Sequence, residues 1–205
     1  MDVYLIKQNL DDFQYLLQEK EADYINTLDK EGEKIENWQI PTWKIFVPNK
    51  KSTKKRKDFN TSSFFSGKLM MEEVLATKMV TKFNLSAQLL PINTPELEQP
   101  FVFVNILDGI SAVVDTFWYT TDELEQADDK MNIFAPKTDK PKRKIHPELH
   151  GKHLFDRKII EKNPIFRDKW FKGFYFCTDV FVKWAEKQQI KGLSFENAGI
   201  LTENT

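Results

Sequence analysis

The middle of the sequence most constrains the fold, because three apolar runs of β-type residues follow one another there. They cover 87–92, 101–107 and 112–119, and prolines and the turn signal Asp108-Gly109 separate them. Short apolar runs with turn residues between them are typical of neighbouring antiparallel strands. We therefore expect a sheet in this region rather than a bundle of helices.

The segments before this region mix helical and strand patterns. Apolar residues spaced along 69–83 predict a helix of about four turns, which needs a sheet beneath it. Residues 3–6 and 43–47 have strand character, and a helix is expected through Phe13, Leu16 and Leu17.

The C-terminal part is expected to add three strands and one helix. The strands are predicted at 154–160, 174–177 and 193–195. Thr178 is expected to cap a helix with an apolar face, which consists of Val180, Phe181, Trp184 and Ala185.

Strands in the middle with helices on either side do not give the alternation of a doubly wound fold. We predict an α+β protein with a mainly antiparallel central sheet and a few packed helices. Its 205 residues, 40% of them hydrophobic, are expected to form one domain, 1–205. Two segments are predicted surface excursions, the lysine-rich 49–58 and the charged 121–153, which prolines interrupt, and 199–205 is predicted to be a frayed tail.

The balance of charge argues against some classes of partner. With 30 basic and 31 acidic residues, the net charge of −1 gives no general attraction to nucleic acid or to an anionic membrane. The start of the chain lacks the basic region of a signal peptide, and no apolar run approaches the ~18 residues of a membrane helix. One cysteine, Cys177, suits a reducing compartment. We expect a cytoplasmic protein with no membrane partner.

Two lysine-rich runs, 50–57 and 137–144, raise the question of local phosphate binding. Neither run contains an aromatic residue on which a base could stack, and an acidic cluster precedes the second. We interpret both as solvated surface, so nucleic acid is not the expected partner.

Three histidines lie within eight positions, at His146, His150 and His153, and such a group can supply metal ligands. Pro147 and Gly151 interrupt a regular helix through them, so a solvated loop is the simpler interpretation. The sequence also contains no phosphate loop, dinucleotide fingerprint or serine nucleophile motif. We predict no cofactor and no metal site, and leave the histidine group open.

An aromatic pair beside acidic residues is the most interesting surface feature of the sequence. Trp118 and Tyr119 come directly before the acidic cluster, and protein-binding surfaces often place aromatic anchors within a ring of charge. The alternative is that Trp118 belongs to the core and the acids are only solvated. The acidic residues are Asp122, Glu123, Glu125, Asp128 and Asp129.

Three further stretches carry a family pattern. The first runs from Phe103 to Asp108 and continues to Val114-Asp115, and the second is Ile165-Phe166-Arg167. The third is Phe176-Cys-Thr-Asp179, followed by the predicted helix and by 190–195. In order and spacing these stretches resemble the immunity proteins of bacterial polymorphic toxin systems, of the type called immunity MXAN protein.

The resemblance implies a cytoplasmic protein that binds a cognate secreted toxin domain and blocks its action. It implies a structural role for its polar motif residues: Asn105 and Asp115 satisfy backbone groups at strand ends, and Arg167 pairs with an acid such as Asp179. Since many nuclease toxins present basic clefts, the expected contact residues for the toxin are Trp118 and the five acids.

Two other functions remain open. One is a small hydrolase or other enzyme with a site around Asp115, Arg167 and Cys177, in which the cysteine acts as a nucleophile. The other is a phosphate-binding or nucleic-acid adaptor that uses both lysine runs. The sequence does not decide whether the chain forms a homo-oligomer.

Overall fold

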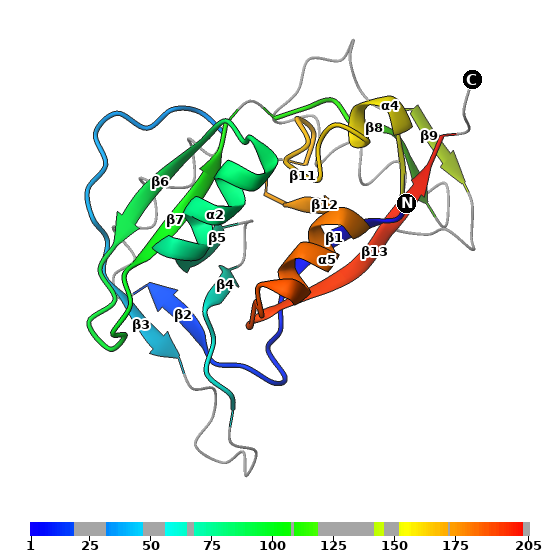
Figure 1. The fold of residues 1–205 in the computed structure, drawn as a ribbon. Coiled ribbons are helices and arrows are strands. Elements are labelled where there is room, and N and C mark those ends of the chain that lie inside the picture. The colour runs from blue at the N-terminus through cyan, green and yellow to red at the C-terminus, as the bar shows by residue number, and fades with distance from the viewer. Residues whose placement is uncertain are drawn as a thin grey trace.

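The computed structural model describes residues 1–18, 32–46, 56–64, 68–107, 109–118, 142–145, 152–171 and 173–202. In this part of the chain the strands form a seven-stranded, a four-stranded and a two-stranded sheet, with helices packed against them (Figure 1). The α+β class is confirmed, but the strands are divided among three sheets. No helix within these ranges is long and apolar enough to cross a membrane.

The seven-stranded sheet is mixed, and it places the first and last strands of the chain side by side at its centre. Two of its pairs, β10 with β13 and β8 with β9, are parallel, whereas the others are antiparallel. In spatial order its strands are β11 (Ile165–Phe166), β12 (Phe176–Thr178), β1 (Val3–Gln8), β13 (Leu193–Leu201), β10 (His153–Phe155), β8 (Val113–Trp118) and β9 (Lys142–Ile145).

The four-stranded sheet is antiparallel throughout and is covered on both faces. All six residues of its strand β7 are buried, with Val102, Val104 and Ile106 in one apolar cluster. Phe101 and Phe103 point to the opposite face and belong to a second cluster. Its strands are β4 (Thr61–Phe64), β5 (Lys68–Glu72), β7 (Phe101–Ile106) and β6 (Ala87–Ile92), and the two-stranded sheet pairs β2 (Tyr15–Gln18) with β3 (Trp43–Phe46).

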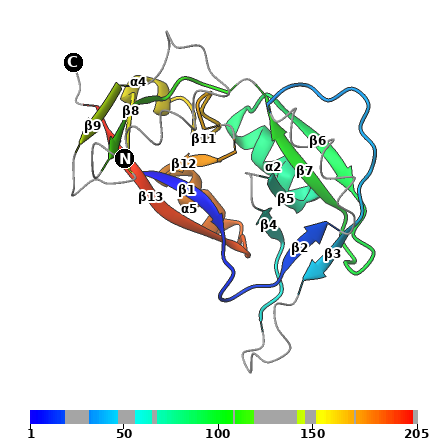
Figure 2. The same ribbon diagram turned by 180° about the vertical axis from the view of Figure 1, so that it is seen from behind.

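The largest core lies between the two larger sheets and under two helices, α2 (Glu73–Phe83) and α5 (Asp179–Lys187). The helices meet through aromatic rings, since Phe83 lies 5.8 Å from Phe181 and 5.4 Å from Trp184, centroid to centroid. Figures 1 and 2 show the two helices on the same side of the molecule. A third helix, the single turn α4 (Arg157–Ile160), helps to cover a separate core on the seven-stranded sheet.

One partly buried amide, that of Gln8, joins the sheets at the end of β1. The Oε1 atom of Gln8 accepts hydrogen bonds from the Ser62 hydroxyl (3.0 Å) and the Ser63 N–H (2.6 Å) of β4. The Nε2 atom donates to the carbonyl of Gly192, just before β13, at 2.8 Å. The Ser62 hydroxyl also accepts the N–H of Leu16 in β2. This Gln8 junction therefore connects strands from all three sheets.

Two other side-chain amides, those of Asn105 and Gln88, hold residues 32–38 against the four-stranded sheet. We call residues 32–38 the strap. Asn105 accepts the N–H of Gly32 and donates to the carbonyl of Glu33, while Gln88 bonds both the N–H and the carbonyl of Ile35. Further along, the Trp38 indole donates to the carbonyl of Pro91 at 2.7 Å. The strap thus runs beside β6 and covers one face of the sheet. The role predicted for Asn105, satisfying backbone groups, is confirmed.

Strands predicted from short apolar runs between turn residues agree best with the structure. The run 87–92 matches β6, and 101–107 contains β7, with which β6 pairs as an antiparallel neighbour. The expected strands at 3–6 and 43–47 are β1 and β3, and the helix after Thr178 is α5. The side chain of Thr178, however, makes no capping hydrogen bond.

One predicted helix is absent, and another begins later than expected. Leu16 lies in strand β2, because residues remote in sequence stabilise it there. Its N–H donates to the Ser62 hydroxyl, and its side chain packs in the second apolar cluster. The helix expected over 69–83 begins only at Glu73, and β5 precedes it. Leu69, Met70 and Met71 are all buried because both faces of this sheet are covered, and a strand that is apolar on both faces resembles a buried helix in sequence.

Three other expectations need correction. The run 112–119, expected to be a neighbour of 101–107, forms β8 in the seven-stranded sheet instead. It pairs with β10 and β9 and not with β7. The expected strand 154–160 is split into β10 and α4 by Asp156, whose carboxylate caps the helix. The expected frayed tail begins inside β13, which continues to Leu201 because β10 pairs with it there.

The predicted excursions are described only in part. In the first, Lys57 bridges to Phe13, and 49–55 lies outside the described residues. In the second, β9 and the first residue of β10 are strands, whereas 121–141 and 146–151 lie outside the described residues.

We predict that Gly192→Ala unfolds or strongly destabilises the protein. Gly192 has φ +112°, and a Cβ atom there would lie 2.1 Å from the carbonyl oxygen of Thr61. Strain of this kind, together with loss of the adjacent Gln8 bond, should cost at least about 3 kcal/mol of unfolding free energy. Urea denaturation measures it. Gly109→Ala is the control, because a Cβ there meets its neighbours at an ordinary 3.6 Å; equal stability of the two variants would contradict the prediction.

Candidate partner-binding surface

Of the residues predicted to contact the toxin, only Trp118 lies in the described part of the chain, at one end of the seven-stranded sheet. Trp118 is the last residue of β8, and the backbone register sets it beside Ile145 of β9. The side chain of Trp118 lies outside the described part, as do all five acidic residues. Their role in binding stays a prediction. The outermost strand here, β9, has the sequence Lys-Arg-Lys-Ile.

Three apolar side chains lie next to one another on β8, β10 and β13 at this end of the sheet. Ile200 of β13 pairs in register with Leu154 of β10, and Val114 of β8 is the extra residue of a β-bulge opposite Leu154. Ile200 is 44% exposed and Val114 43%, and Leu154 is partly buried. We call these three residues the outer row.

The outer row points away from the core on the same strands. Val113 and Phe155 are paired across β8 and β10, and both belong to a buried aromatic cluster, against which Leu201 also packs. Because successive side chains of β10 and β13 point to opposite faces, Leu154 and Ile200 lie on the other side of the sheet from Phe155 and Leu201. They form an apolar patch on the face that this cluster leaves uncovered, and the exposed Val114 lies beside them at the bulge.

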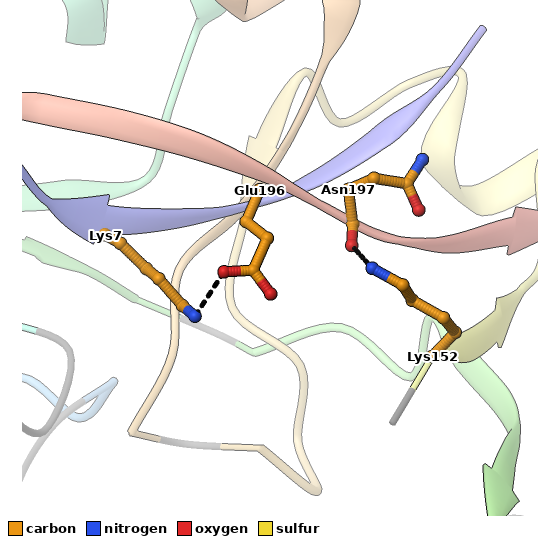
Figure 3. A network of polar contacts seen from close by, with 4 residues as sticks. All are labelled: Lys7, Lys152, Glu196 and Asn197. Atoms are coloured by element: carbon orange, nitrogen blue, oxygen red, sulfur yellow. Dashed lines mark hydrogen bonds and ion pairs between the residues drawn. The ribbon is translucent and has the colours of Figure 1, made fainter. Parts of the chain in front are cut away.

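A side-chain hydrogen bond and a close approach of two backbones fix the position of β10, which carries Leu154, the middle residue of the row. The Lys152 ammonium donates to the carbonyl of Asn197 in β13, close to an exposed ion pair between Lys7 and Glu196 (Figure 3). A Cβ at Gly199 would lie 1.9 Å from the carbonyl oxygen of His153, so β10 packs closely against β13 at this point. A larger residue at 199 would separate the two strands.

A buried carboxylate that the sequence analysis missed fixes the start of β8. Asp168 accepts the N–H groups of Ala112 and Val113, each at 2.8 Å, and that of Trp170. Burial raises the pKa of Asp168, although these backbone N–H groups act in the opposite direction. The acid at the start of Asp168-Lys-Trp170 is compatible with a local turn, but nothing local indicates its bonds to residues more than fifty positions earlier.

The three residues considered for an enzymatic site do not come together as that hypothesis requires. Asp115 lies on β8 and Cys177 on β12, with β1, β13 and β10 between them. Cys177 is fully buried in the main core, and burial raises the pKa of its thiol. A thiol that stays protonated at neutral pH is a poor nucleophile.

Asp179, the acid named above as an example of a partner for Arg167, does not pair with it. The Arg167 guanidinium is buried and lies over the ring of Tyr175, 5.4 Å from the centroid, with Gly32 of the strap beside it. Asp179 instead bonds Lys183 on the same helix through Oδ2, and its Oδ1 has no hydrogen-bond partner. Arg167 therefore contributes to packing between the strap and the segment after β11.

Of the three histidines, only His153 lies in the described part, where aromatic rings surround it. Its ring centroid lies 4.5 Å from that of Phe171 and within 6 Å of those of Phe155 and Phe176. Burial, with a smaller effect from the charge of Lys152, lowers its pKa to about 4. No three His, Cys, Asp or Glu side chains among the described residues are grouped to hold a metal ion.

Comparison with known proteins supplies no family. None of the protein-family models matches the chain, and no curated protein matches it. The resemblance to immunity proteins therefore stands on the sequence stretches alone.

We predict that His153 makes the protein less stable as the pH falls from 6.5 to 4. The unfolded chain takes up a proton at His153 near pH 6.5, whereas the folded chain does so only near pH 4, so acid favours the unfolded state. The loss should reach at most about 3 kcal/mol. Urea denaturation at pH 7, 5.5 and 4.5 measures it. His153→Phe should remove this part of the pH dependence; an unchanged slope would assign it to other groups.

Proposed function

We propose that this protein binds a cognate toxin protein and neutralises it, with the outer row at the centre of the binding surface. The family resemblance suggests the partner. The observation that supports a binding role is the outer row itself, in which Val114 and Ile200 stay exposed on either side of Leu154. Contiguous exposed apolar side chains mark protein-binding sites more often than isolated ones do.

The size of the outer row limits the binding free energy that it can contribute. Covering its exposed parts would supply roughly 2 to 4 kcal/mol, since full burial of one such side chain is worth about 1.5 to 3 kcal/mol. A stable interface needs about 800 Å² on each partner, so the row is a centre and requires polar surroundings. The residues next to it in the fold, Lys152 and the strand β9 with Trp118 beside it, belong to such a rim.

In this proposal, the protein neutralises the toxin without catalysing a reaction. A protein that covers the toxin's active site, or holds it in an unproductive conformation, inhibits by occupancy alone. The buried protonated thiol and the wide separation of Asp115 from Cys177 give the enzymatic alternative no support from geometry.

The decisive experiment is coexpression with the product of the adjacent upstream reading frame. The proposal expects the toxic product to stop growth alone, growth to resume in the presence of this protein, and the two chains to purify as one complex. Rescue without a complex would indicate enzymatic relief instead, and absence of both rescue and complex would contradict the proposal for that toxin.

Charged substitutions in the outer row should abolish binding. Val114→Asp combined with Ile200→Asp would bury two carboxylates in the interface, and we expect at least about 100-fold weaker affinity by titration calorimetry. Val74→Asp is the matched control, because Val74 is an equally apolar side chain, 58% exposed, on α2. The same loss in both variants, or in neither, would show that the outer row is not the contact.

Charge reversal of the five predicted acids tests the other part of the surface. Changing all five, Asp122, Glu123, Glu125, Asp128 and Asp129, to lysine should slow association with a basic toxin several-fold at low salt and much less at high salt. Stopped-flow association rates at two ionic strengths measure it. An unchanged rate at low salt would remove these acids from the contact surface.

A further inference from the structure

The outer face of the two-stranded sheet carries two aromatic side chains. On the inner face, Leu16, Trp43 and Ile45 belong to or pack against the second apolar cluster. Because successive side chains of a strand point to opposite faces, Tyr15 and Phe46 lie on the outer face, where they are paired in register. Their ring centroids are 5.2 Å apart, and both side chains keep part of their surface exposed. We call these two residues the aromatic pair.

Basic side chains lie beside the aromatic pair. The Arg56 guanidinium donates to the carbonyl of Phe13, just before β2, at 3.4 Å, and the Lys57 ammonium lies 5.8 Å from the centroid of the Phe13 ring. Backbone hydrogen bonds on both sides of Phe13 hold Lys57 in this position. Burial raises the pKa of Tyr15, and the charge of Arg56 opposes this rise, so the guanidinium is close enough to act on the hydroxyl. The basic residues and the aromatic pair therefore form one surface.

The segment that joins the two parts of this surface is strongly basic. Residues 44–57 contain seven basic side chains and no acidic one. Its ends are anchored at the surface, since Phe46 pairs with β2 and Arg56 bonds Phe13. The acids that lie close to this segment in sequence or in space leave a surplus of positive charge. They are Asp11, Asp12, Asp58 and Glu96.

The fold supplies what the first lysine-rich run lacks in sequence. Residues 50–57 contain no aromatic side chain, so the sequence predicts only a solvated surface there. In the structure, the aromatic pair and Phe13 lie next to the end of this run. Proteins that bind single-stranded nucleic acid without reading its sequence combine two components, aromatic rings on which bases stack and a basic surface that attracts the phosphates. Both are present here.

We propose that this surface binds single-stranded nucleic acid, with bases stacked on the aromatic pair and phosphates beside Arg56 and Lys57. An acidic protein would use the positive charge but would leave the aromatic pair without a role. A duplex has its bases already stacked on one another. Figures 1 and 2 show β2 and β3 at the far end of the molecule from β8 and β9, so this binding leaves the outer row free and does not depend on a toxin.

Fluorescence anisotropy of the whole chain with a labelled oligonucleotide of about 15 nucleotides tests the proposal. We expect a dissociation constant of roughly 1 to 100 µM, which rises with salt concentration, and weaker binding of a duplex of the same length. Absence of binding in this range at low salt would overturn the proposal. A poly-glutamate peptide of equal charge that binds as tightly as the oligonucleotide would also overturn it, in favour of an acidic protein partner.

An oligonucleotide without bases separates stacking from charge and uses the unaltered chain. It carries the same number of phosphates, so the electrostatic attraction is unchanged. Loss of stacking on the two rings should weaken its binding at least about fivefold relative to the normal oligonucleotide. Equal affinity for the two would show that the bases are not contacted, which the proposal does not survive.

Removal of the basic residues should change the salt dependence of binding. Arg56→Gln combined with Lys57→Gln removes two phosphate contacts, so the slope of log affinity against log salt should become shallower by about 1.4. Lys78→Gln combined with Lys82→Gln is the matched control, because these two lysines are exposed on α2. The same change of slope in both double variants, or in neither, would place the contact elsewhere.

Removal of the aromatic pair should weaken binding without changing its salt dependence. Tyr15→Leu combined with Phe46→Leu keeps apolar side chains on the sheet but removes the rings, so we expect at least about fivefold weaker binding with the original slope. Unaltered affinity in this variant would contradict stacking on the pair and overturn the proposal.

Discussion

The partly buried amide of Gln8, bonded to the buried Ser62 and Ser63, is the contact on which the arrangement of the sheets depends. It accepts from two groups of β4 and donates to the carbonyl of Gly192, and one of its partners, Ser62, also receives the N–H of Leu16. A buried polar network is costly when any member is left unsatisfied, so the sheets are held in the one arrangement that satisfies all of it. Gly192 permits this because its backbone lies against Thr61, where no side chain fits.

Fixing the sheets at this end determines what is exposed at the other. The main core occupies the space between the two larger sheets, and the aromatic cluster around Phe155 fills the opposite face of the seven-stranded sheet. Strands β8 and β10 extend that sheet beyond the main core, with the Asp168 carboxylate holding the start of β8. The outer row is exposed because the sheet there is wider than the layer that covers its second face.

Local pattern predicted elements whose stabilising contacts are local, and failed where a distant partner decides. The run 87–92 is a short apolar segment that pairs with the next run along the chain, so its strand was predictable. Leu16 and Leu69 belong to strands whose neighbours the sequence does not identify, and both were assigned to helices. For the candidate surface, the sequence pointed to Trp118, but Val114, Leu154 and Ile200 come from three separate stretches that only the fold brings together.

The central position of β13 has a consequence for biosynthesis. Strand β1 is made before its two partners, β12 and β13, which follow it more than 165 residues later. At about 5 to 20 residues per second the apolar side chains of β1 wait on the order of ten seconds or more without their sheet. The nascent chain is therefore a substrate for chaperones that hold exposed strands, and a message truncated before Leu193 yields a product whose first strand lacks its central neighbour.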